Sequence, residues 1–180
     1  MKVQIKITDG TVIDPERNFC GPADVLLDGS KVAGMEENSS AEAEKIISAA
    51  GCLVLPGLID FHAHLYDGGT ENGVCADLAC LPMGVTTAVD AGSCGADNFE
   101  GFMRAVVSSN RMRIFSLLNI CPVGLATTRF HEELRLEYYD EKAMAELFGR
   151  YKNHLFGLKV RQSKDLAGNL GLSRFSAPYR

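Results

Sequence analysis

The stretch Pro56-Gly57-Leu58-Ile59-Asp60-Phe61-His62-Ala63-His64 decides both the fold and the candidate chemistry of this chain. Side chains alternate between the two faces of a strand, so Asp60, His62 and His64 are expected on one face and the residues between them on the other. Two imidazoles two residues apart on a rigid strand can reach one metal ion. The adjacent carboxylate of Asp60 is expected to orient one of them. The alternative is two histidines satisfied by ordinary hydrogen bonds.

The residues before this stretch are typical of a small β domain. Apolar and polar residues alternate in the first predicted strand, at Val3, Ile5 and Ile7. Thr8-Asp9-Gly10 and Asp28-Gly29-Ser30 are turn signals between further short strands. The small and polar segment 39–44 predicts a loop. Pro56-Gly57 then interrupts the pattern, so we predict a domain boundary there and a small β domain segment over 1–56.

After Gly57 short apolar strands alternate with longer helical patterns. Strands are predicted over 58–65, 86–91, 113–120 and 155–161, and helices over 74–81, 98–109 and 141–152. This alternation indicates an α/β fold with a parallel sheet and crossover helices. Four strands cannot close a barrel, which takes about eight. The region 57–162 is therefore either an open sheet or the first half of a barrel, and 163–180 is predicted to be an irregular tail.

Lys159 is the second chemical signal, because it lies inside the apolar strand Leu155-Phe156-Gly157-Leu158-Lys159-Val160-Arg161. Burying an ammonium group is costly, which favours the neutral amine. A neutral amine can react with carbon dioxide to form an anionic carbamate, whose two oxygens can bridge two divalent ions. The alternative is a lysine that extends from the end of the strand into water.

Composition excludes several classes of function. The formal net charge is −5 and no run of Lys or Arg occurs, so neither a nucleic acid nor an anionic membrane is expected as a partner. The N-terminus has no signal-peptide pattern, and no apolar stretch is long enough to span a bilayer. We therefore expect a cytoplasmic protein whose cysteines are reduced and mostly buried. The six cysteines are Cys20, Cys52, Cys75, Cys80, Cys94 and Cys121.

Three motifs together resemble the amidohydrolase superfamily, most closely its dihydroorotase-like amidohydrolase/deacetylase group. They are PGLIDFHAH (56–64), GVTTAVDAGS (84–93) and GLKVR (157–161). The segments GTVIDPERN and GPADVLLDGSKVAGM resemble the small β domain of that family. The resemblance covers the chain up to about residue 161, and it implies the N-terminal part of a (β/α)8 TIM barrel preceded by a β-sandwich segment.

The resemblance also implies a metal site. His62 and His64 would bind the more buried metal, and a carboxylated Lys159 would bridge two divalent ions, usually zinc. The metals would lower the pKa of a bridging water and polarise the carbonyl group of an amide, cyclic imide or ester. Arg161, on the same strand face as Lys159, is a candidate anchor for a substrate carboxylate, with a surface arginine as the alternative. Asp90 is a candidate near the substrate, with a helix cap as the alternative.

Later parts of the family's site have no counterpart in this chain. Two further histidines and a catalytic aspartate follow in the family, so we assign no catalytic residue here and expect little turnover from this chain alone. His131 and His154 are expected not to bind metal. Dihydroorotases typically have an arginine where this chain has Tyr66, and a phenol cannot form the bidentate pair with a carboxylate that an arginine forms.

Three functions remain open from the sequence. The first is a metal-dependent hydrolase acting on a small-molecule substrate. The second is a non-catalytic truncated homologue or interaction module. The third is an open nucleotide-binding domain, but Asp67-Gly68-Gly69 does not supply the glycine-rich fingerprint that this needs. Exposed edge strands in a half-barrel would also favour a homo-oligomer.

Overall fold

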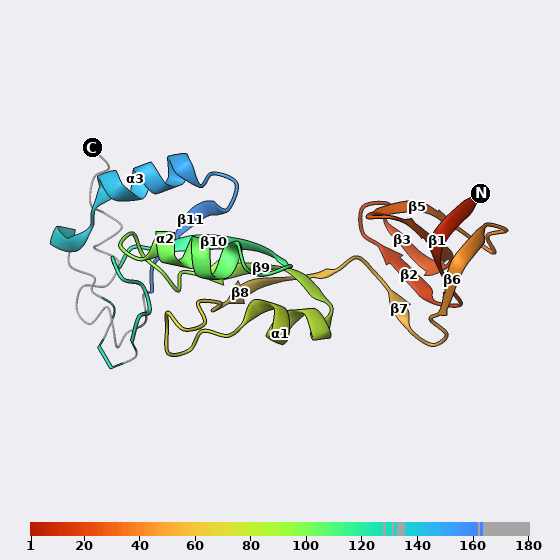
Figure 1. Ribbon diagram of the computed structural model, residues 1–180, viewed down its shortest axis with the longest axis horizontal. Helices are drawn as coiled ribbons and strands as arrows, with labels where there is room; N and C mark the ends of the chain where they lie inside the picture. Colours follow the sequence, from red (N-terminus) through yellow and green to blue (C-terminus); the bar gives the residue numbers. More distant parts are fainter. Residues whose placement is uncertain (128, 131, 133–135, 162, 164–180) are drawn as a thin grey trace. The chain divides into compact units, whose positions relative to one another are not determined.

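The computed structural model describes residues 1–127, 129, 130, 132, 136–161 and 163 (Figure 1). The chain divides into two compact units, Met1–Pro56 and Gly57–Arg180. The first unit contains only strands, whereas the second combines strands with helices. No helix in the described ranges is long and apolar enough to cross a membrane.

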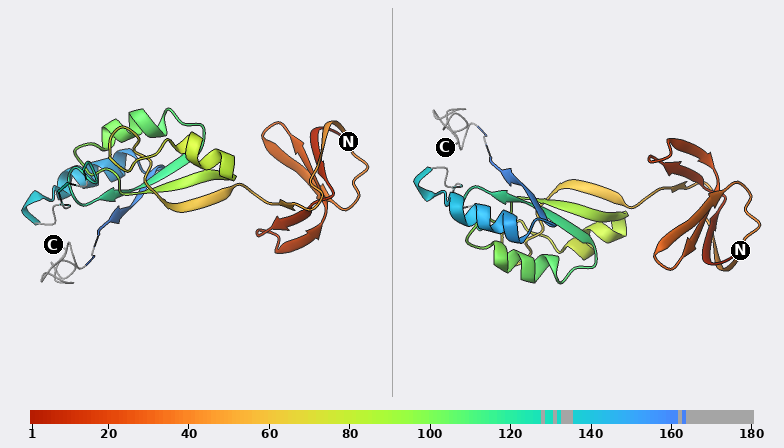
Figure 2. Two further views of the ribbon diagram at one scale, coloured as in Figure 1. Left: turned by 90° about the horizontal axis from the view of Figure 1, so that it is seen from below. Right: turned by 90° about the horizontal axis from the view of Figure 1, so that it is seen from above.

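The first unit consists of two small sheets (Figure 2). One sheet has the order β5-β4-β1-β6 and the other the order β3-β2-β7. The strands are β1 (Lys2–Thr8), β2 (Thr11–Asp14), β3 (Phe19–Pro22), β4 (Asp24–Asp28), β5 (Lys31–Glu36), β6 (Glu42–Ser48) and β7 (Leu53–Val54). Val12, Ala23 and Val25 form a small buried cluster, and Leu26 is fully buried. The unit is held by these few apolar side chains together with the strand ladders.

Two features of this unit differ from the sequence-based expectation. The predicted loop is wrong for Glu42–Glu44, because β6 already begins at Glu42 and pairs in parallel with β1 from Lys2 onward. β3 was not predicted, since its sequence Phe-Cys-Gly-Pro has no alternation of apolar and polar residues. It lies at the edge of its sheet, the position in which a sheet tolerates proline.

The second unit is built on a parallel four-stranded sheet in the order β11-β10-β9-β8. Its strands are β8 (Leu58–Ala63), β9 (Val85–Ala91), β10 (Arg113–Asn119) and β11 (Leu155–Lys159). The helices between them are α1 (Ala76–Cys80), α2 (Phe99–Phe102) and α3 (Glu141–Arg150). Short 3-10 segments cover Leu81–Met83 and Leu136–Tyr138, and α2 continues as a π-helical turn over Met103–Val107. The parallel pairing and the crossover helices agree with the predicted alternation.

The helices and the sheet share one core. Phe99 and Phe102 of α2 are fully buried and pack in the same cluster as Ile114, Leu118 and Leu155 of the sheet. Burying each such side chain stabilises the fold by about 1.5–3 kcal/mol. This cluster therefore fixes the strands whose ends carry the candidate site.

The opposite face of the sheet is hollow and apolar. The ring centroids of Phe61 and Phe156 are 6.1 Å apart, although β8 and β11 are the outermost strands. Phe115 of β10 lies 6.0 Å from Phe156. The sheet must curl for its outer strands to meet in this way. The hollow has a volume of about 340 Å³ and is lined by Ile59, Phe61, Thr87, Val89, Phe115, Lys152, Asn153, His154 and Phe156.

The first strand of this sheet departs from simple alternation. Its pairing with β9 is irregular between Asp60 and Ala63, where an extra residue is inserted. We expected Ile59, Phe61 and Ala63 on one face, but Ala63 packs against the helix-side core while the other two line the hollow. The inserted residue changes the face that each following side chain occupies.

The six cysteines are free thiols. Cys80, Cys94 and Cys121 are buried, as expected for small apolar residues. Cys20 and Cys52 are exposed, so the expectation of burial is wrong for these two. Cys20 lies on the edge strand β3.

Candidate functional site

The predicted site residues come together at the carboxyl edge of the parallel sheet. His62 and His64 lie at the end of β8, Asp90 near the end of β9, and Lys159 at the end of β11. The carboxyl ends of parallel strands share one edge, which is where α/β folds bind their ligands. His62, Asp90 and Lys159 all act electrostatically on His64.

The two histidine rings are direct neighbours. Their centroids are 5.6 Å apart and the rings are nearly perpendicular, at 87°. His62 is exposed and His64 is half-buried. Burial lowers the pKa of His64, while the nearby Asp90 raises it. Desolvation has the larger effect and favours the neutral imidazole, which is the form that binds metal.

Asp60 does not orient an imidazole as predicted. Its Oδ1 accepts a hydrogen bond of 2.9 Å from the backbone N–H of His62. The short side chain thus folds back on its own strand, at the place where the pairing with β9 becomes irregular. Asp60 therefore supports the backbone of the histidine strand rather than a ring.

Asp90 is buried at this edge of the sheet, and its predicted place near the substrate stays a prediction. It is 0% exposed, and its two oxygens accept hydrogen bonds from the backbone N–H groups of Leu65 (2.8 Å) and Ser93 (2.7 Å). Burial raises the pKa of Asp90, and these hydrogen bonds oppose that rise. A carboxylate enclosed in this way ties the end of β8 to the loop after β9. It does not cap a helix.

Ser93 is a site residue that the sequence analysis missed. Its Oγ lies 3.0 Å from Nδ1 of His64, and Ser93 is fully buried. A serine in a glycine-containing loop gives no chemical signal by itself. Only the fold shows that it meets a histidine 29 positions earlier in the chain.

Lys159 is partly buried and fits closely against the loop after β9. A Cβ atom added to Gly92 would lie 2.6 Å from Cβ and from Cγ of Lys159. Gly92 also has a φ of +80°, which other residues rarely adopt. Asn119 pairs with Lys159 across the two strands and donates a hydrogen bond to the carbonyl of Gly92 at 3.0 Å. Gly92 is therefore needed both for the turn and for the position of the lysine.

Arg161 faces a carboxylate. Its Nη1 is 3.8 Å from Oε2 of Glu132, a side chain that is only 6% exposed. Oε1 of Glu132 accepts a hydrogen bond of 2.8 Å from Asn119. Oε2 of Glu132 is buried without a hydrogen bond. Sequence reasoning gave no reason to select Glu132, because it follows no strand or motif.

The remaining predicted positions lie away from this edge. His154 precedes β11, and its Nδ1 is 3.2 Å from the carbonyl oxygen of Ile114. It thus lies at the opposite end of the strand from Lys159. The ring of Tyr66 packs on Phe102 of α2 at 5.4 Å. His131 lies outside the described residues.

The side chains at this edge fit a divalent metal in part. Two neighbouring imidazoles are suitable ligands, and a carbamate on Lys159 would add oxygen ligands. Within the described ranges, however, no group of three or more His, Cys, Asp or Glu side chains is placed to hold a metal ion. Oε2 of Glu132 forms no hydrogen bond, and the cationic group beside it is the guanidinium of Arg161, 3.8 Å away.

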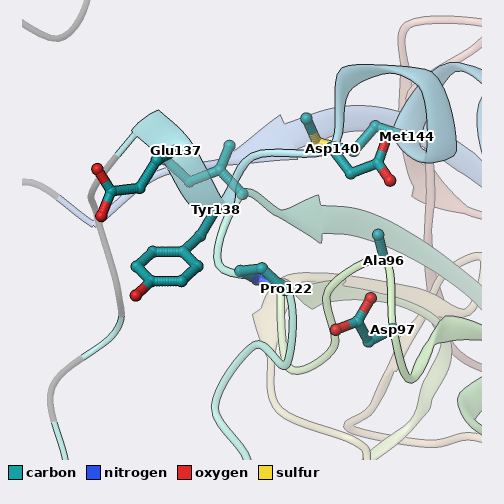
Figure 3. Close-up of a pocket in the computed structure, with 8 residues that line it drawn as sticks. Ala96, Asp97, Pro122, Glu137, Tyr138, Asp140 and Met144 are labelled. Atoms are coloured by element: carbon teal, nitrogen blue, oxygen red, sulfur yellow. The ribbon is translucent and has the colours of Figure 1, made fainter.

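A separate pocket of about 300 Å³ lies beside the start of α3 (Figure 3). It contains none of the predicted site residues and is lined by Ala96, Asp97, Ile120, Pro122, Glu137, Tyr138, Asp140 and Met144. Asp140 is already engaged, because its side chain accepts a hydrogen bond from the N–H of Ala143 and caps α3. The carboxylate of Asp140 in this pocket is therefore used by the start of α3.

Comparison with known proteins gives the same family from both sequence and structure. A deacetylase of Agrobacterium fabrum is 35% identical over 153 residues, which are 83% of this chain and 38% of that protein. A deacetylase of Brucella anthropi is 34% identical over 154 residues, with the same shares. The crystal structure of a dihydroorotase superposes with a TM-score of 0.84 at 30% identity, covering 95% of this chain and 46% of that one. No family model matches the sequence.

The chain thus spans 38% of the length of both curated relatives. The β-rich first unit and the parallel α/β second unit both fall within the match to the dihydroorotase, since that match covers 95% of the chain. The chain belongs to the amidohydrolase superfamily, corresponding to an N-terminal portion of its dihydroorotase-like and deacetylase members.

Proposed function

We propose that this chain contributes the first half of the active site of a metal-dependent amidohydrolase that cleaves an amide, cyclic imide or ester bond of a small acid. The observation that carries the proposal is the side-by-side arrangement of the His62 and His64 rings, 5.6 Å apart at the carboxyl edge of the sheet. Lys159 ends the last strand at the same edge and acts electrostatically on His64. The names of the relatives support hydrolysis of a carbon–nitrogen or acyl bond.

His62 and His64 would hold one divalent ion, and a carboxylated Lys159 would bridge it to a second. By the resemblance the ions are zinc. Such ions supply a Lewis acid that polarises the scissile carbonyl and makes water a nucleophile near neutral pH. The half-buried His64 and the fixed Lys159 would keep their positions before the metal binds, because Ser93 and Gly92 contact them from the loop after β9.

Arg161 is the proposed anchor for a carboxylate on the substrate. Its guanidinium lies 3.8 Å from the carboxylate of Glu132, and a guanidinium can form a bidentate pair with a carboxylate. Tyr66 packs on α2, so it provides no cation at the position where dihydroorotases have an arginine. This difference favours a deacetylase-like reaction on a small acid over the dihydroorotase reaction. The catalytic aspartate of the family has no counterpart among the site residues of this chain.

The curl of the sheet supports a (β/α)8 barrel as the complete architecture. Ile59, Phe61 and Phe156 are exposed in the hollow, which is the face that further strands would cover in a closed barrel. We propose 1–56 as the β-sandwich segment, 57–162 as the first half of the barrel and 163–180 as a tail. The partner would be a small molecule in the cytoplasm, and the exposed edge strands β8 and β11 favour a homo-oligomer.

One observation favours a non-catalytic role. The described part of the chain has no cluster of three metal-binding side chains of the usual types. If Lys159 carries no carbamate, the two histidines alone would hold a metal weakly, and the chain would act as an interaction module.

Zinc binding to the full chain separates the two functions. Isothermal titration with zinc and metal analysis of the dialysed protein should show binding that the substitution His64→Asn weakens by at least about tenfold, since even supporting residues of metal sites contribute this much. His154→Asn is the matched control, because it removes an imidazole at the opposite end of β11. Carbon-13 bicarbonate should give a carbamate signal that Lys159→Met abolishes. A wild-type chain that binds no zinc, or equal binding by the two histidine variants, would exclude the hydrolase site.

A further inference from the structure

The contact between His64 and Ser93 raises the question of which group gives the proton. Nδ1 of His64 and Oγ of Ser93 are 3.0 Å apart, and either atom can be the donor. If Ser93 donates, the ring carries its hydrogen on Nε2. If Ser93 accepts, the hydrogen is on Nδ1 and the lone pair of Nε2 is available to a metal.

Asp90 determines which atom donates in the hydrogen bond between Ser93 and His64. The backbone N–H of Ser93 donates to Asp90 at 2.7 Å, so the hydroxyl of Ser93 lies beside the same carboxylate, and this side chain lowers the pKa of Asp90. A serine hydroxyl has one hydrogen to give, and a carboxylate can only accept. Hydrogen bonds to charged groups are stronger than hydrogen bonds between neutral groups. The hydroxyl of Ser93 therefore donates to Asp90 and accepts from Nδ1–H of His64.

The same carboxylate fixes both ends of this arrangement. Asp90 accepts the backbone N–H of Ser93 at 2.7 Å and the backbone N–H of Leu65, the residue after His64, at 2.8 Å. The buried carboxylate of Asp90 thus fixes the backbone beside both the hydroxyl of Ser93 and the imidazole of His64. Asp90 and Ser93 are both 0% exposed, so water does not compete for these hydrogen bonds.

We propose that Asp90 and Ser93 form a positioning relay that holds His64 as the Nδ1–H tautomer and leaves its Nε2 atom for a metal ion. The tautomer follows from the contacts of this chain alone, and only the use of Nε2 rests on the proposed function. Neither residue touches the reacting atoms. Ser93 acts through His64, and Asp90 acts through Ser93.

Nuclear magnetic resonance of the full chain tests the relay without metal. Long-range proton–nitrogen spectra at about pH 8, with chelator present, distinguish the two tautomers of a neutral imidazole. The wild-type chain should show His64 as the Nδ1–H form. Ser93→Ala should convert most of His64 to the Nε2–H form, and Ser93→Thr should restore the wild-type pattern, because threonine retains the hydroxyl.

Ser116→Ala is the matched control. Ser116 is also fully buried in this unit, but its hydroxyl donates to the carbonyl of Leu117 at 3.0 Å. The substitution Ser116→Ala should leave the His64 tautomer unchanged. An Nε2–H form in the wild-type chain overturns the proposal, and so does an unchanged tautomer in folded Ser93→Ala. If Ser93→Ala does not fold, the wild-type and Ser93→Thr spectra still decide the outcome.

Zinc titration of the same variants separates the relay from the hydrolase proposal. Ser93→Ala should weaken zinc binding by about 10–100-fold, as expected for a residue that orients a metal ligand, and Ser93→Thr should not. If the wild-type chain has the Nδ1–H tautomer but binds no zinc, the relay stands and the hydrolase proposal fails. If zinc binds equally to wild type and to folded Ser93→Ala, the assignment of Nε2 to the metal is overturned.

Discussion

Replacing Gly92 by alanine should damage the fold and the lysine position together. Gly92 has a φ of +80°, and a Cβ atom there would lie 2.6 Å from two carbons of Lys159. Gly84 is a matched control at the other end of β9. It has a φ of +78°, but nothing lies within 4 Å of the position where a Cβ atom would be added.

The two substitutions share the backbone strain and differ in the contact. A non-glycine residue in the left-handed region costs about 1–2 kcal/mol in the free energy of unfolding. Crowding a packed region adds about 1–3 kcal/mol. We therefore expect Gly84→Ala to lose about 1–2 kcal/mol and Gly92→Ala about 2–5 kcal/mol. Relief of the contact requires Lys159 to move by about 1 Å, since ordinary carbon contacts lie near 3.5–4.0 Å.

Tyrosine fluorescence during urea unfolding measures the difference in the free energy of unfolding of the second unit. The chain has no tryptophan, and its five tyrosines all follow residue 57, so the signal reports the second unit. The difference between the two variants is the quantity of interest, because effects of Gly→Ala on the unfolded chain cancel. Equal losses in the two variants would show that the contact with Lys159 is not tight and would refute the reasoning.

Two further predictions concern the second unit. Tyr151 donates a hydrogen bond to Glu100 and holds the pKa of that carboxyl below its usual value, so this contribution to stability is present above about pH 4.3 and is lost as the pH falls through the lowered pKa. Glu100→Gln should therefore flatten the acid limb of a stability-against-pH curve from urea titrations, and an unchanged limb would contradict the assignment. Phe102→Ala should destabilise this unit by about 3–5 kcal/mol because Phe102 is fully buried, whereas Phe61→Ala should cost less than about 1 kcal/mol because Phe61 is 64% exposed. Comparable losses of unfolding free energy in the two variants would mean that Phe61 is buried and not exposed in the hollow.

The order of elements in the second unit could be predicted from the sequence. The strands 86–91 and 113–120 were expected to within one residue of β9 and β10. Apolar runs with helical patterns between them leave few alternatives to parallel pairing. The edges were less exact, because β8 ends at Ala63 and β11 at Lys159, two residues before the predicted ends.

The irregular features could not be predicted, because they depend on partners distant in sequence. The insertion between Asp60 and Ala63 exists only relative to β9, and it decides which face Ala63 occupies. The π-helical turn after Phe102 is stabilised by contacts of the core, which the helical period alone does not reveal. β3 was missed because tertiary pairing with β2 overrides its low strand propensity.

The sequence alone selected the candidate metal-binding residues, but not the residues that contact them. His62, His64 and Lys159 have a recognisable spacing or an unusual environment within a single strand. Ser93 and Glu132 have neither, and they meet the site through contacts that span 29 residues to His64 and 13 to Asn119. A motif within one strand can be recognised from the sequence. The residues that contact it from other parts of the chain become apparent only in the folded structure.

The contact between Phe61 and Phe156 has a consequence for folding during translation. These rings belong to the first and last strands of the sheet, so the contact cannot exist until β11 has left the ribosome. Domains form from the N-terminal side as the chain is synthesised, at about 5–20 residues per second. A nascent chain that has released β8, β9 and β10 would therefore expose a flatter apolar surface for several seconds. We expect a chaperone to bind the nascent chain during this interval, because the apolar surface is then exposed.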